Sequence, residues 1–365
     1  MDERQKVFLV AGARPNFMKI APVYRQALQH PEVNCRIVHT GQHYDYEMSQ
    51  AFFDDLDLPK PDFFLEAGSG SHAVQTGRIM VAFEALCEAE KPDLVMVVGD
   101  VNSTLACTIV AKKALIQVAH VEAGLRSFDL TMPEEINRMV TDVLADYFFV
   151  TEQSGMANLL KEGKPQERIH FVGNVMVDNL FHQAEKLKTC GSDAFPSAAM
   201  KQAPGGYAFL TLHRPANVDQ KENFEEIAGA LNRIAQERMI LFPVHPRTDK
   251  MLKIHDIHLS ANIKRLPPLG FRESLFLWKD AAVVLTDSGG LQEETTALGV
   301  PCVTLRNNTE RPITIEMGSN VLGGTRAETI LAAYQEALNG AKKGYRAPPK
   351  WDGRAAERIW EIVTR

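Results

Sequence analysis

Residues 94–104 read LVMVVGDVNST, and this stretch decides the fold class of the chain. Its first five residues are all apolar. An unbroken apolar run of this length predicts a strand buried on both faces, because a strand with one solvated face alternates apolar and polar residues. Such a strand belongs to a parallel sheet with helices packed outside it. A helical pattern follows over Thr104–Leu115, so we predict an α/β protein.

The same alternation of apolar runs and helical patterns recurs along the chain and restarts once. In the first half we predict further helices over Phe17–Gln29 and Gly155–Lys161, and further strands over Val7–Ala11, Cys35–His39, Val118–Val121, Tyr147–Val150 and Ile169–Val172. In the second half the predicted strands are Ala208–Leu212, Ile240–Val244, Ile263–Leu266, Ala282–Leu285 and Cys302–Leu305. Two doubly wound, Rossmann-like domains are the expected result.

The length of 365 residues also favours two domains, since it exceeds what one hydrophobic core usually serves. Lys188–Gly206 has no periodicity and marks the junction. We expect domains at 1–185 and 186–350, and an amphipathic helix over 351–365 that could cross back to the first domain. Ligands of open α/β sheets bind beyond the carboxyl ends of the strands, so we expect a site in a cleft that both domains face.

Composition excludes several classes of protein. The net charge of −6 argues against a nucleic-acid partner. The five cysteines form no C-x-x-C pair, which argues against a disulfide framework or a zinc site and fits a reducing cytoplasm. The apolar run Val7–Gly12 is too short for a signal peptide, and no stretch is long enough to span a bilayer. We expect a cytoplasmic protein without membrane contact.

Charged residues follow the predicted strands of the first domain. Arg14 lies in the turn after the first strand and Lys19 one helical turn later, where cations suit a phosphate, although a plain turn with surface cations explains them equally well. Asp100 follows Leu94–Val98; Asn102 or Ser103 is better placed to cap the next helix, which leaves Asp100 free for chemistry. Glu122 ends the strand Val118–Val121, either as a functional carboxylate or as an ion-pair partner of Arg126.

The helix opening at Pro133 carries Glu134 and Glu135 in its first turn. Acidic residues there complement the positive end of the helix, which accounts for one of the two. The other is then available to the expected cleft.

In the second domain, His213-Arg214 ends one predicted strand and His245-Pro246-Arg247 follows the next. The former could meet a diphosphate. Neither has metal-ligand spacing. Thr286-Asp287-Ser288-Gly289-Gly290-Leu291-Gln292-Glu293 opens a helix after Ala282–Leu285. Its glycines allow close approach to an anion, and the start of the helix offers free N–H groups. Ser288 can donate to a phosphate, and Glu293, which we place in the first turn, can reach a ribose. The purely structural interpretation is a capped helix start.

Two common nucleotide motifs are missing. The chain has no G-x-G-x-x-G and no G-x-x-x-x-G-K-[ST], which argues against a nicotinamide site and against P-loop chemistry.

Seven motifs together resemble the non-hydrolysing UDP-N-acetylglucosamine 2-epimerases, in order and nearly without gaps as far as Gly324. They are Gly12-Ala13-Arg14-Pro15 with Lys19, Gly41-Gln42-His43, Gly99-Asp100, His120-Val121-Glu122-Ala123-Gly124-Leu125-Arg126, Pro133-Glu134-Glu135-Ile136-Asn137-Arg138, Ser288-Gly289-Gly290-Leu291-Gln292-Glu293-Glu294 and Asn308-Thr309-Glu310-Arg311-Pro312.

The resemblance implies a glycosyltransferase-B-like fold, a homodimer, and conversion of UDP-N-acetylglucosamine to UDP-N-acetylmannosamine without added cofactor. Because no Cys, His or Asp cluster has metal-ligand spacing, we also expect no metal. The implied catalytic residues are Asp100, Glu122, Glu134 and His213. The implied UDP contacts are Arg14, Lys19, Phe271, Ser288, Gly289, Gly290 and Glu293. Candidates for further substrate contacts, or for a second, activating UDP-sugar site, are Gln42, His43, Gln75, Arg138, Arg214 and His245.

The chemistry agrees with this set of residues. The hydrogen on carbon 2 of the sugar is not next to a carbonyl, so direct deprotonation is too difficult. Elimination of UDP followed by its return avoids that problem, and it requires acid and base groups on both sugar faces.

Departures from the family pattern leave the exact sugar open. Asn16 and Pro215-Ala216 stand where many members have other residues, and the Gly-Ala-Arg-Pro opening also occurs in relatives that epimerise UDP-2,3-diacetamido-glucuronic acid. Three further functions stay open at this point: a hydrolysing epimerase, a glycosyltransferase of the same fold and a non-catalytic nucleotide-sugar sensor.

Overall fold

The computed structural model describes residues 4–41, 53–191, 195–203, 206–340 and 345–365. Their contacts divide the chain into two compact units. Unit 1 comprises Met1–Asn179 and Pro349–Arg365, and unit 2 comprises Leu180–Pro348. We expected the second domain to span 186–350, so its first residue lies six positions earlier than predicted and its last residue two positions earlier. The first boundary falls inside the helix Val175–Thr189, where the sequence shows no break.

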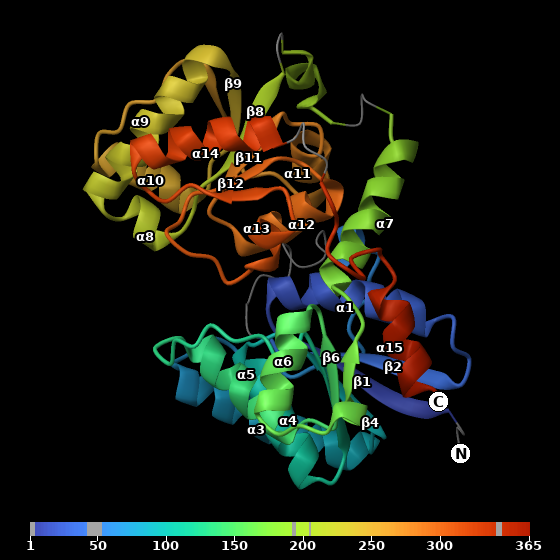
Figure 1. Ribbon diagram of the computed structural model, residues 1–365. Coiled ribbons are helices and arrows are strands. Elements are labelled where there is room, and N and C mark those ends of the chain that lie inside the picture. Colours follow the sequence, from blue (N-terminus) through green and yellow to red (C-terminus); the bar gives the residue numbers. More distant parts are fainter. Residues whose placement is uncertain (1–3, 42–52, 192–194, 204–205, 341–344) are drawn as a thin grey trace. The chain divides into compact units, whose positions relative to one another are not determined.

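Unit 1 contains the following elements in chain order (Figure 1). They are β1 (Gln5–Ala11), α1 (Arg14–Ala27), β2 (Val33–His39), β3 (Phe63–Phe64), α3 (His72–Glu90), β4 (Leu94–Val98), α4 (Asn102–Lys113), β5 (Gln117–Val121), α5 (Pro133–Leu144), β6 (Tyr147–Val150), α6 (Gln153–Lys161), β7 (Ile169–Phe171), the start of α7 (Val175–Thr189) and, at the chain end, α15 (Ala355–Val363).

Within the described residues, unit 1 holds a parallel sheet of seven strands in the order β3-β2-β1-β4-β5-β6-β7. Alternate residues of each strand enter separate cores. Val7 and Leu9 pack with Phe17 of α1 and Trp360 of α15, whereas Phe8 packs with α3 and α4. Both faces of the sheet are thus covered, which is why runs such as Val7–Ala11 and Leu94–Val98 are apolar throughout.

The C-terminal helix α15 packs against α1 in unit 1. Trp360 is fully buried, and its indole N–H donates to the carbonyl oxygen of Val23 (2.8 Å). Asp178 accepts hydrogen bonds from the backbone N–H groups of Ala355 (3.1 Å) and Ala356 (2.7 Å), which satisfies two donors at the start of α15.

Unit 2 repeats the arrangement. Its elements are β8 (Tyr207–Thr211), α8 (Pro215–Val218), α9 (Lys221–Glu237), β9 (Met239–Pro243), α10 (Pro246–Ile254), β10 (Ile263–Leu266), α11 (Phe271–Trp278), β11 (Val283–Thr286), α12 (Gly289–Leu298), β12 (Cys302–Thr304), α13 (Ile313–Glu316), β13 (Asn320–Leu322) and α14 (Ala327–Gly340). In the part of the unit that is described, six parallel strands follow the order β10-β9-β8-β11-β12-β13.

The predicted α/β, doubly wound class is confirmed, and each predicted apolar run is a strand whose ends shift by at most two residues. In both sheets the chain order reverses between two central strands, β1 and β4 in unit 1 and β8 and β11 in unit 2. Beyond the carboxyl ends of those strands lies the usual ligand position of such sheets.

Candidate active site

The first turn of unit 1 is built around Asn16, which is buried. Its side-chain oxygen accepts a hydrogen bond from the N–H of Ala13 (3.0 Å), and its amide donates to the carbonyl oxygen of Val98 (3.1 Å). Gly12 has no room for a side chain, since a Cβ there would lie 2.0 Å from the hydroxyl oxygen of Ser103. This packing brings the end of β1 against the end of β4 and leaves Arg14, the first residue of α1, exposed.

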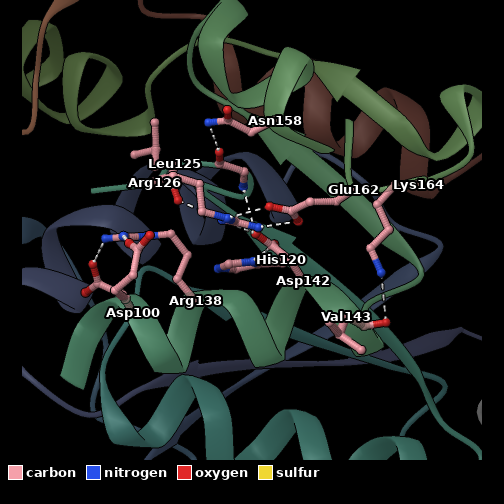
Figure 2. A network of polar contacts seen from close by, with 12 residues as sticks. Asp100, His120, Leu125, Arg126, Arg138, Asp142, Val143, Asn158, Glu162 and Lys164 are labelled. Atoms are coloured by element: carbon pink, nitrogen blue, oxygen red, sulfur yellow. Dashed lines mark hydrogen bonds and ion pairs between the residues drawn. The ribbon is translucent and has the colours of Figure 1, made fainter. Parts of the chain in front are cut away.

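Asp100, directly after β4, forms an ion pair with Arg138 of α5 (Figure 2). Arg138 is buried and also pairs with Glu135 (2.7 Å), and Asn137 donates to the carbonyl oxygen of Asp100 (2.9 Å). Asp100 is therefore held by α5. The expected capping of α4 by Asn102 or Ser103 is wrong: both lie inside α4, and the N-cap residue is Val101.

Glu122, directly after β5, forms an ion pair with Lys19 of α1. The ion pair between Glu122 and Arg126, which was the structural alternative, is not formed. Arg126 pairs instead with Asp142 (2.7 Å) and Glu162 (2.7 Å). Lys19 is a predicted phosphate ligand. An ammonium group has three donors, so the bond to Glu122 leaves others for an anion.

Glu134 and Glu135 have different surroundings. Glu135 is buried and accepts hydrogen bonds from the backbone N–H groups of Ser127 (2.9 Å) and Phe128 (3.1 Å). Burial raises its pKa, but these bonds and the charge of Arg138 outweigh that effect and lower it. Glu134 is exposed. Glu135 is thus the structural residue of the two, and Glu134 is accessible to a ligand.

In unit 2, Asp287 follows β11 and is fully buried. It accepts hydrogen bonds from the backbone N–H groups of His213 (2.9 Å) and Arg214 (2.8 Å), and its carboxylate lies 2.9 Å from Nδ1 of His213. Burial raises the pKa of Asp287, but the hydrogen bond and charge of His213 outweigh burial, so the net shift is downward. Asp287 thus fixes the His213 ring. The sequence signal was present, since Asp287 follows an apolar strand as Asp100 does, but its role was missed.

The rings of His213 and His245 lie 5.9 Å apart, centre to centre. His245 is the N-cap of α10 and accepts a hydrogen bond from the N–H of Arg247. Its pKa is lowered by partial burial, then by the charges of His213 and Arg247. The structure therefore brings together two of the histidines that sequence patterns single out.

Three arginines gather with two carboxylates near the start of α12. Arg306 forms two hydrogen bonds with Glu310 (2.7 and 3.0 Å), Arg214 lies 3.7 Å from Glu310, and Arg311 pairs with Glu293 (2.9 Å). The Arg306 bond is the main cause that lowers the pKa of Glu310, to about 2. Burial and then the charge of Arg306 lower the pKa of Arg214. Arg306 and Arg311 had no predicted role, since only their spacing to Glu310 could have indicated one.

Ser288 is the N-cap of α12, and its hydroxyl accepts a hydrogen bond from the N–H of Leu291 (3.5 Å). The hydroxyl proton remains available to a phosphate. A Cβ on Gly290 would meet no described atom within 4 Å, and one on Gly289 only a Glu310 oxygen at 3.9 Å. The first turn of the helix thus leaves room for an anion.

The carboxylates of Glu293 and Glu294 on α12 have different surroundings. Glu293 is the fifth residue of α12, so its placement in the first turn was wrong, and its carboxylate is paired with Arg311. Glu294 is buried and has no hydrogen-bond or ion-pair partner among the described residues. Burial, followed by the charge of Glu293, raises the pKa of Glu294 to about 8.

The remaining predicted contacts are less grouped. Phe271 is half-buried at the start of α11. Gln75 is buried in unit 1, where its amide donates to the carbonyl oxygen of Gly68 (3.1 Å) and accepts from Asn102 (2.8 Å). Gln42 and His43 lie outside the described residues.

No three His, Cys, Asp or Glu side chains of the described segments are grouped so that they could hold a metal ion. None of the helices in these segments combines the length and apolar character of a membrane span.

Each unit thus presents charged side chains beyond the carboxyl ends of its central parallel strands, as nucleotide-binding α/β proteins do. The sequence pattern of the UDP-N-acetylglucosamine 2-epimerase family matches residues 25–364. This chain belongs to that family.

Similar proteins support the assignment. A UDP-N-acetylglucosamine 2-epimerase of Methanocaldococcus jannaschii is 43% identical over 98% of this chain and 99% of its own. A UDP-2,3-diacetamido-2,3-dideoxy-D-glucuronate 2-epimerase of Pseudomonas aeruginosa is 38% identical over 91% of this chain and 92% of its own.

Solved structures agree. That of the M. jannaschii UDP-GlcNAc 2-epimerase in complex with UDP-GlcNAc and UDP superposes with a TM-score of 0.87 at 40% identity, covering 99% of both chains. The structure of a UDP-glucosyltransferase of Polygonum tinctorium superposes with a TM-score of 0.64 at 16% identity, covering 99% of both chains. At this identity the likeness shows a shared fold only. The predicted glycosyltransferase-B-like fold is confirmed.

Proposed function

We propose that this chain converts UDP-N-acetylglucosamine to UDP-N-acetylmannosamine by eliminating UDP and adding it back to carbon 1 while a proton reaches carbon 2 from the opposite face of the sugar. The observation that carries the proposal is the position of Asp100 and Glu122. These carboxylates follow adjacent strands, β4 and β5, and each is fixed by a cation from a helix. Family membership and the close relatives support the same reaction.

The chemical step begins at carbon 2. One carboxylate of unit 1 accepts the proton from carbon 2 while the bond from carbon 1 to the diphosphate oxygen breaks, which yields a glycal and UDP. UDP then returns to carbon 1 while a second acid delivers a proton to the other face of carbon 2. No net oxidation occurs, so no redox cofactor is required. We assign proton transfer to Asp100, Glu122 and Glu134, and an acid or base role to His213, whose ring Asp287 orients.

The leaving diphosphate requires positive charge that is in place before it forms. In unit 2 this is the task of Arg214, Arg306 and Arg311 together with Ser288 and the N–H groups of Gly289 and Gly290. Unit 1 adds Arg14 and Lys19, and Phe271 is assigned to the uracil. We favour Glu294 over the predicted Glu293 for the ribose hydroxyls, because Glu293 is already paired with Arg311 and Glu294 is not.

The test is incubation with UDP-N-acetylglucosamine in deuterated water, with carbon 2 followed by NMR. Deuterium at carbon 2 of an intact UDP-sugar is expected. Release of UDP and free N-acetylmannosamine would instead identify a hydrolysing epimerase. A requirement for an acceptor, with no deuterium at carbon 2, would identify a glycosyltransferase. Binding of the UDP-sugar without any turnover would identify a sensor.

The sugar is tested by comparing kcat/KM for UDP-N-acetylglucosamine and UDP-2,3-diacetamido-glucuronic acid, because the P. aeruginosa relative is a UDP-2,3-diacetamido-2,3-dideoxy-D-glucuronate 2-epimerase. We propose the former as the better substrate. We further propose a cytoplasmic homodimer, which sedimentation and cell fractionation test. A second, activating UDP-sugar bound through Gln42, His43, Gln75, Arg138, Arg214 and His245 would appear as sigmoidal rates.

A further inference from the structure

One buried carboxylate, that of Asp142 on α5, collects three donors from β5 and the segment that follows it (Figure 2). Nδ1 of His120 lies 2.6 Å from it, the backbone N–H of Gly124 donates at 3.0 Å, and a guanidinium nitrogen of Arg126 lies 2.7 Å away. The side chains of Asp142 and His120 are fully buried. Neither residue has a part in the reaction described above.

The other ring nitrogen of His120 faces a second acceptor. Nε2 lies 2.8 Å from the carbonyl oxygen of Gly99. Because a carbonyl oxygen can only accept, Nε2 of His120 donates to Gly99, while Nδ1 faces the Asp142 carboxylate, which also pairs with Arg126. The buried His120 ring thus bridges Gly99 to Asp142.

These bonds fix the backbone at both proposed acid/base carboxylates. Gly99, just before Asp100, is in the left-handed region at φ +67°, and its N–H donates to the carbonyl oxygen of Val121 (3.0 Å). Glu122 is also left-handed, at φ +74°, although it is not glycine. Such a conformation persists only where the surroundings determine it. The two donors that flank Glu122, His120 and Gly124, both bind Asp142.

Helix α5 joins the two carboxylates through neighbouring turns. Arg138 pairs with Asp100, and Asp142, four residues later on the same helix face, binds His120 and Gly124. The helix therefore holds the loop of Asp100 and the loop of Glu122 in one arrangement.

We propose that His120 and Asp142 are a positioning pair that holds Asp100 and Glu122 at the separation and orientation that proton transfer at carbon 2 requires. This inference rests on the proposed epimerase function. Loss of the pair displaces the two carboxylates unequally, since His120 contacts both loops and Asp142 directly contacts only that of Glu122. One proton transfer then slows more than the other, and the glycal intermediate escapes.

The variants are His120→Gln, His120→Asn and Asp142→Asn in the full chain. Asp146→Asn is the matched control: Asp146 is also a hydrogen-bonded carboxylate, with contacts to Lys112 (2.7 Å) and the N–H of Val118 (2.8 Å), but it lies near the amino end of β5. Calorimetric titration with UDP gives the concentration of binding-competent protein, to which every rate is referred. Steady-state kinetics and NMR then give kcat, KM and the ratio of released glycal to epimerised UDP-sugar.

We expect kcat to fall by about 10- to 100-fold in the His120 and Asp142 variants, since misplacement by about 1 Å has an effect of that size. KM should change by less than about threefold, and the ratio of glycal to epimer should rise. The control should retain both kcat and the ratio.

A reduced folded fraction alone cannot change a product ratio, so an unchanged ratio in folded variants overturns the proposal. So does an equal effect of Asp146→Asn, or failure of all three variants to fold, which would make the pair a requirement of folding only. Absence of deuterium at carbon 2 with the unaltered chain is a separate result, which rejects the proposed function itself.

Discussion

Lys19 of α1 and Glu122, which follows β5, form an ion pair whose side chains are only 12% and 8% exposed. Gly99 makes room for it, because a Cβ at that position would lie 2.9 Å from the Lys19 ammonium nitrogen. The pair links a proposed phosphate ligand to a proposed acid/base residue. A charge change at either residue therefore affects stability as well as turnover.

The replacement Glu122→Gln should lower both properties. It leaves the Lys19 charge largely buried without its partner, so the free energy of unfolding should fall by about 1–3 kcal/mol. Turnover should fall by about 10²–10⁴-fold, because the amide cannot accept the proton. Adding Lys19→Met should recover stability, measured by urea unfolding, but not turnover. Recovery of turnover by the second change would show that Glu122 acts only through the pair.

The replacement Glu134→Gln separates the two effects, since Glu134 is exposed. Turnover should fall by about 10²–10⁴-fold if Glu134 transfers a proton, with the melting temperature nearly unchanged. Asp100→Asn, at a carboxylate paired with Arg138, should show both losses. Near-normal turnover in the folded Glu134, Asp100 and Glu122 variants together would reject the elimination mechanism.

Calorimetry with UDP tests which glutamate of α12 contacts the ribose. Above pH 8, where Glu294 is ionised, Glu294→Gln should weaken UDP binding by about 1.5–3 kcal/mol, because a charge-assisted hydrogen bond is removed. Glu293→Gln, the matched change one residue earlier, loses its bond to Arg311 and should lower stability more than affinity. The opposite ranking of affinities would return the ribose contact to Glu293, as the sequence predicted.

Stability should depend on pH through Glu294. Its pKa is raised by burial from the ordinary 4.5 to about 8 in the folded chain. The folded state therefore binds more protons between these values, and the stability that protonated Glu294 contributes is complete below pH 4.5 and is lost as pH rises through 8. Relative to Glu294→Gln, the unaltered chain should lose about 1.4 kcal/mol per pH unit between about pH 5 and 7.5 in urea unfolding. Parallel curves for the two proteins would mean that Glu294 is not protonated in this range.

Turnover should survive exhaustive EDTA treatment. Arg214, Arg306 and Arg311 and the start of α12 supply positive charge for the diphosphate. Rates measured with and without EDTA should agree. A loss that magnesium restores would show that the phosphate groups need a cation which these residues do not replace.

Short-range patterns accounted for most of the fold. Leu94–Val98 and Tyr147–Val150 are strands with the predicted bounds, because an apolar run flanked by turn residues has few other ways to be buried. The strands β3 and β13 were missed, since two or three residues that are only partly buried carry no periodic signal. Helix starts were placed two or three residues late at α1 and α4, where polar turn residues already belong to the helix.

The sequence by itself determined the doubly wound architecture, the strand ends on which charged side chains gather, and the family to which the chain belongs. Only the tertiary structure decided the partners: Lys19 rather than Arg126 for Glu122, Arg138 for Asp100, and Arg311 for Glu293 while Glu294 has no ion-pair partner among the described residues. The physical reason is that the positions of strands and helices along the chain are encoded by local periodicity. Ion pairing in a low-dielectric interior depends instead on which side chains from distant segments come within about 4 Å of each other, and no local pattern records that distance.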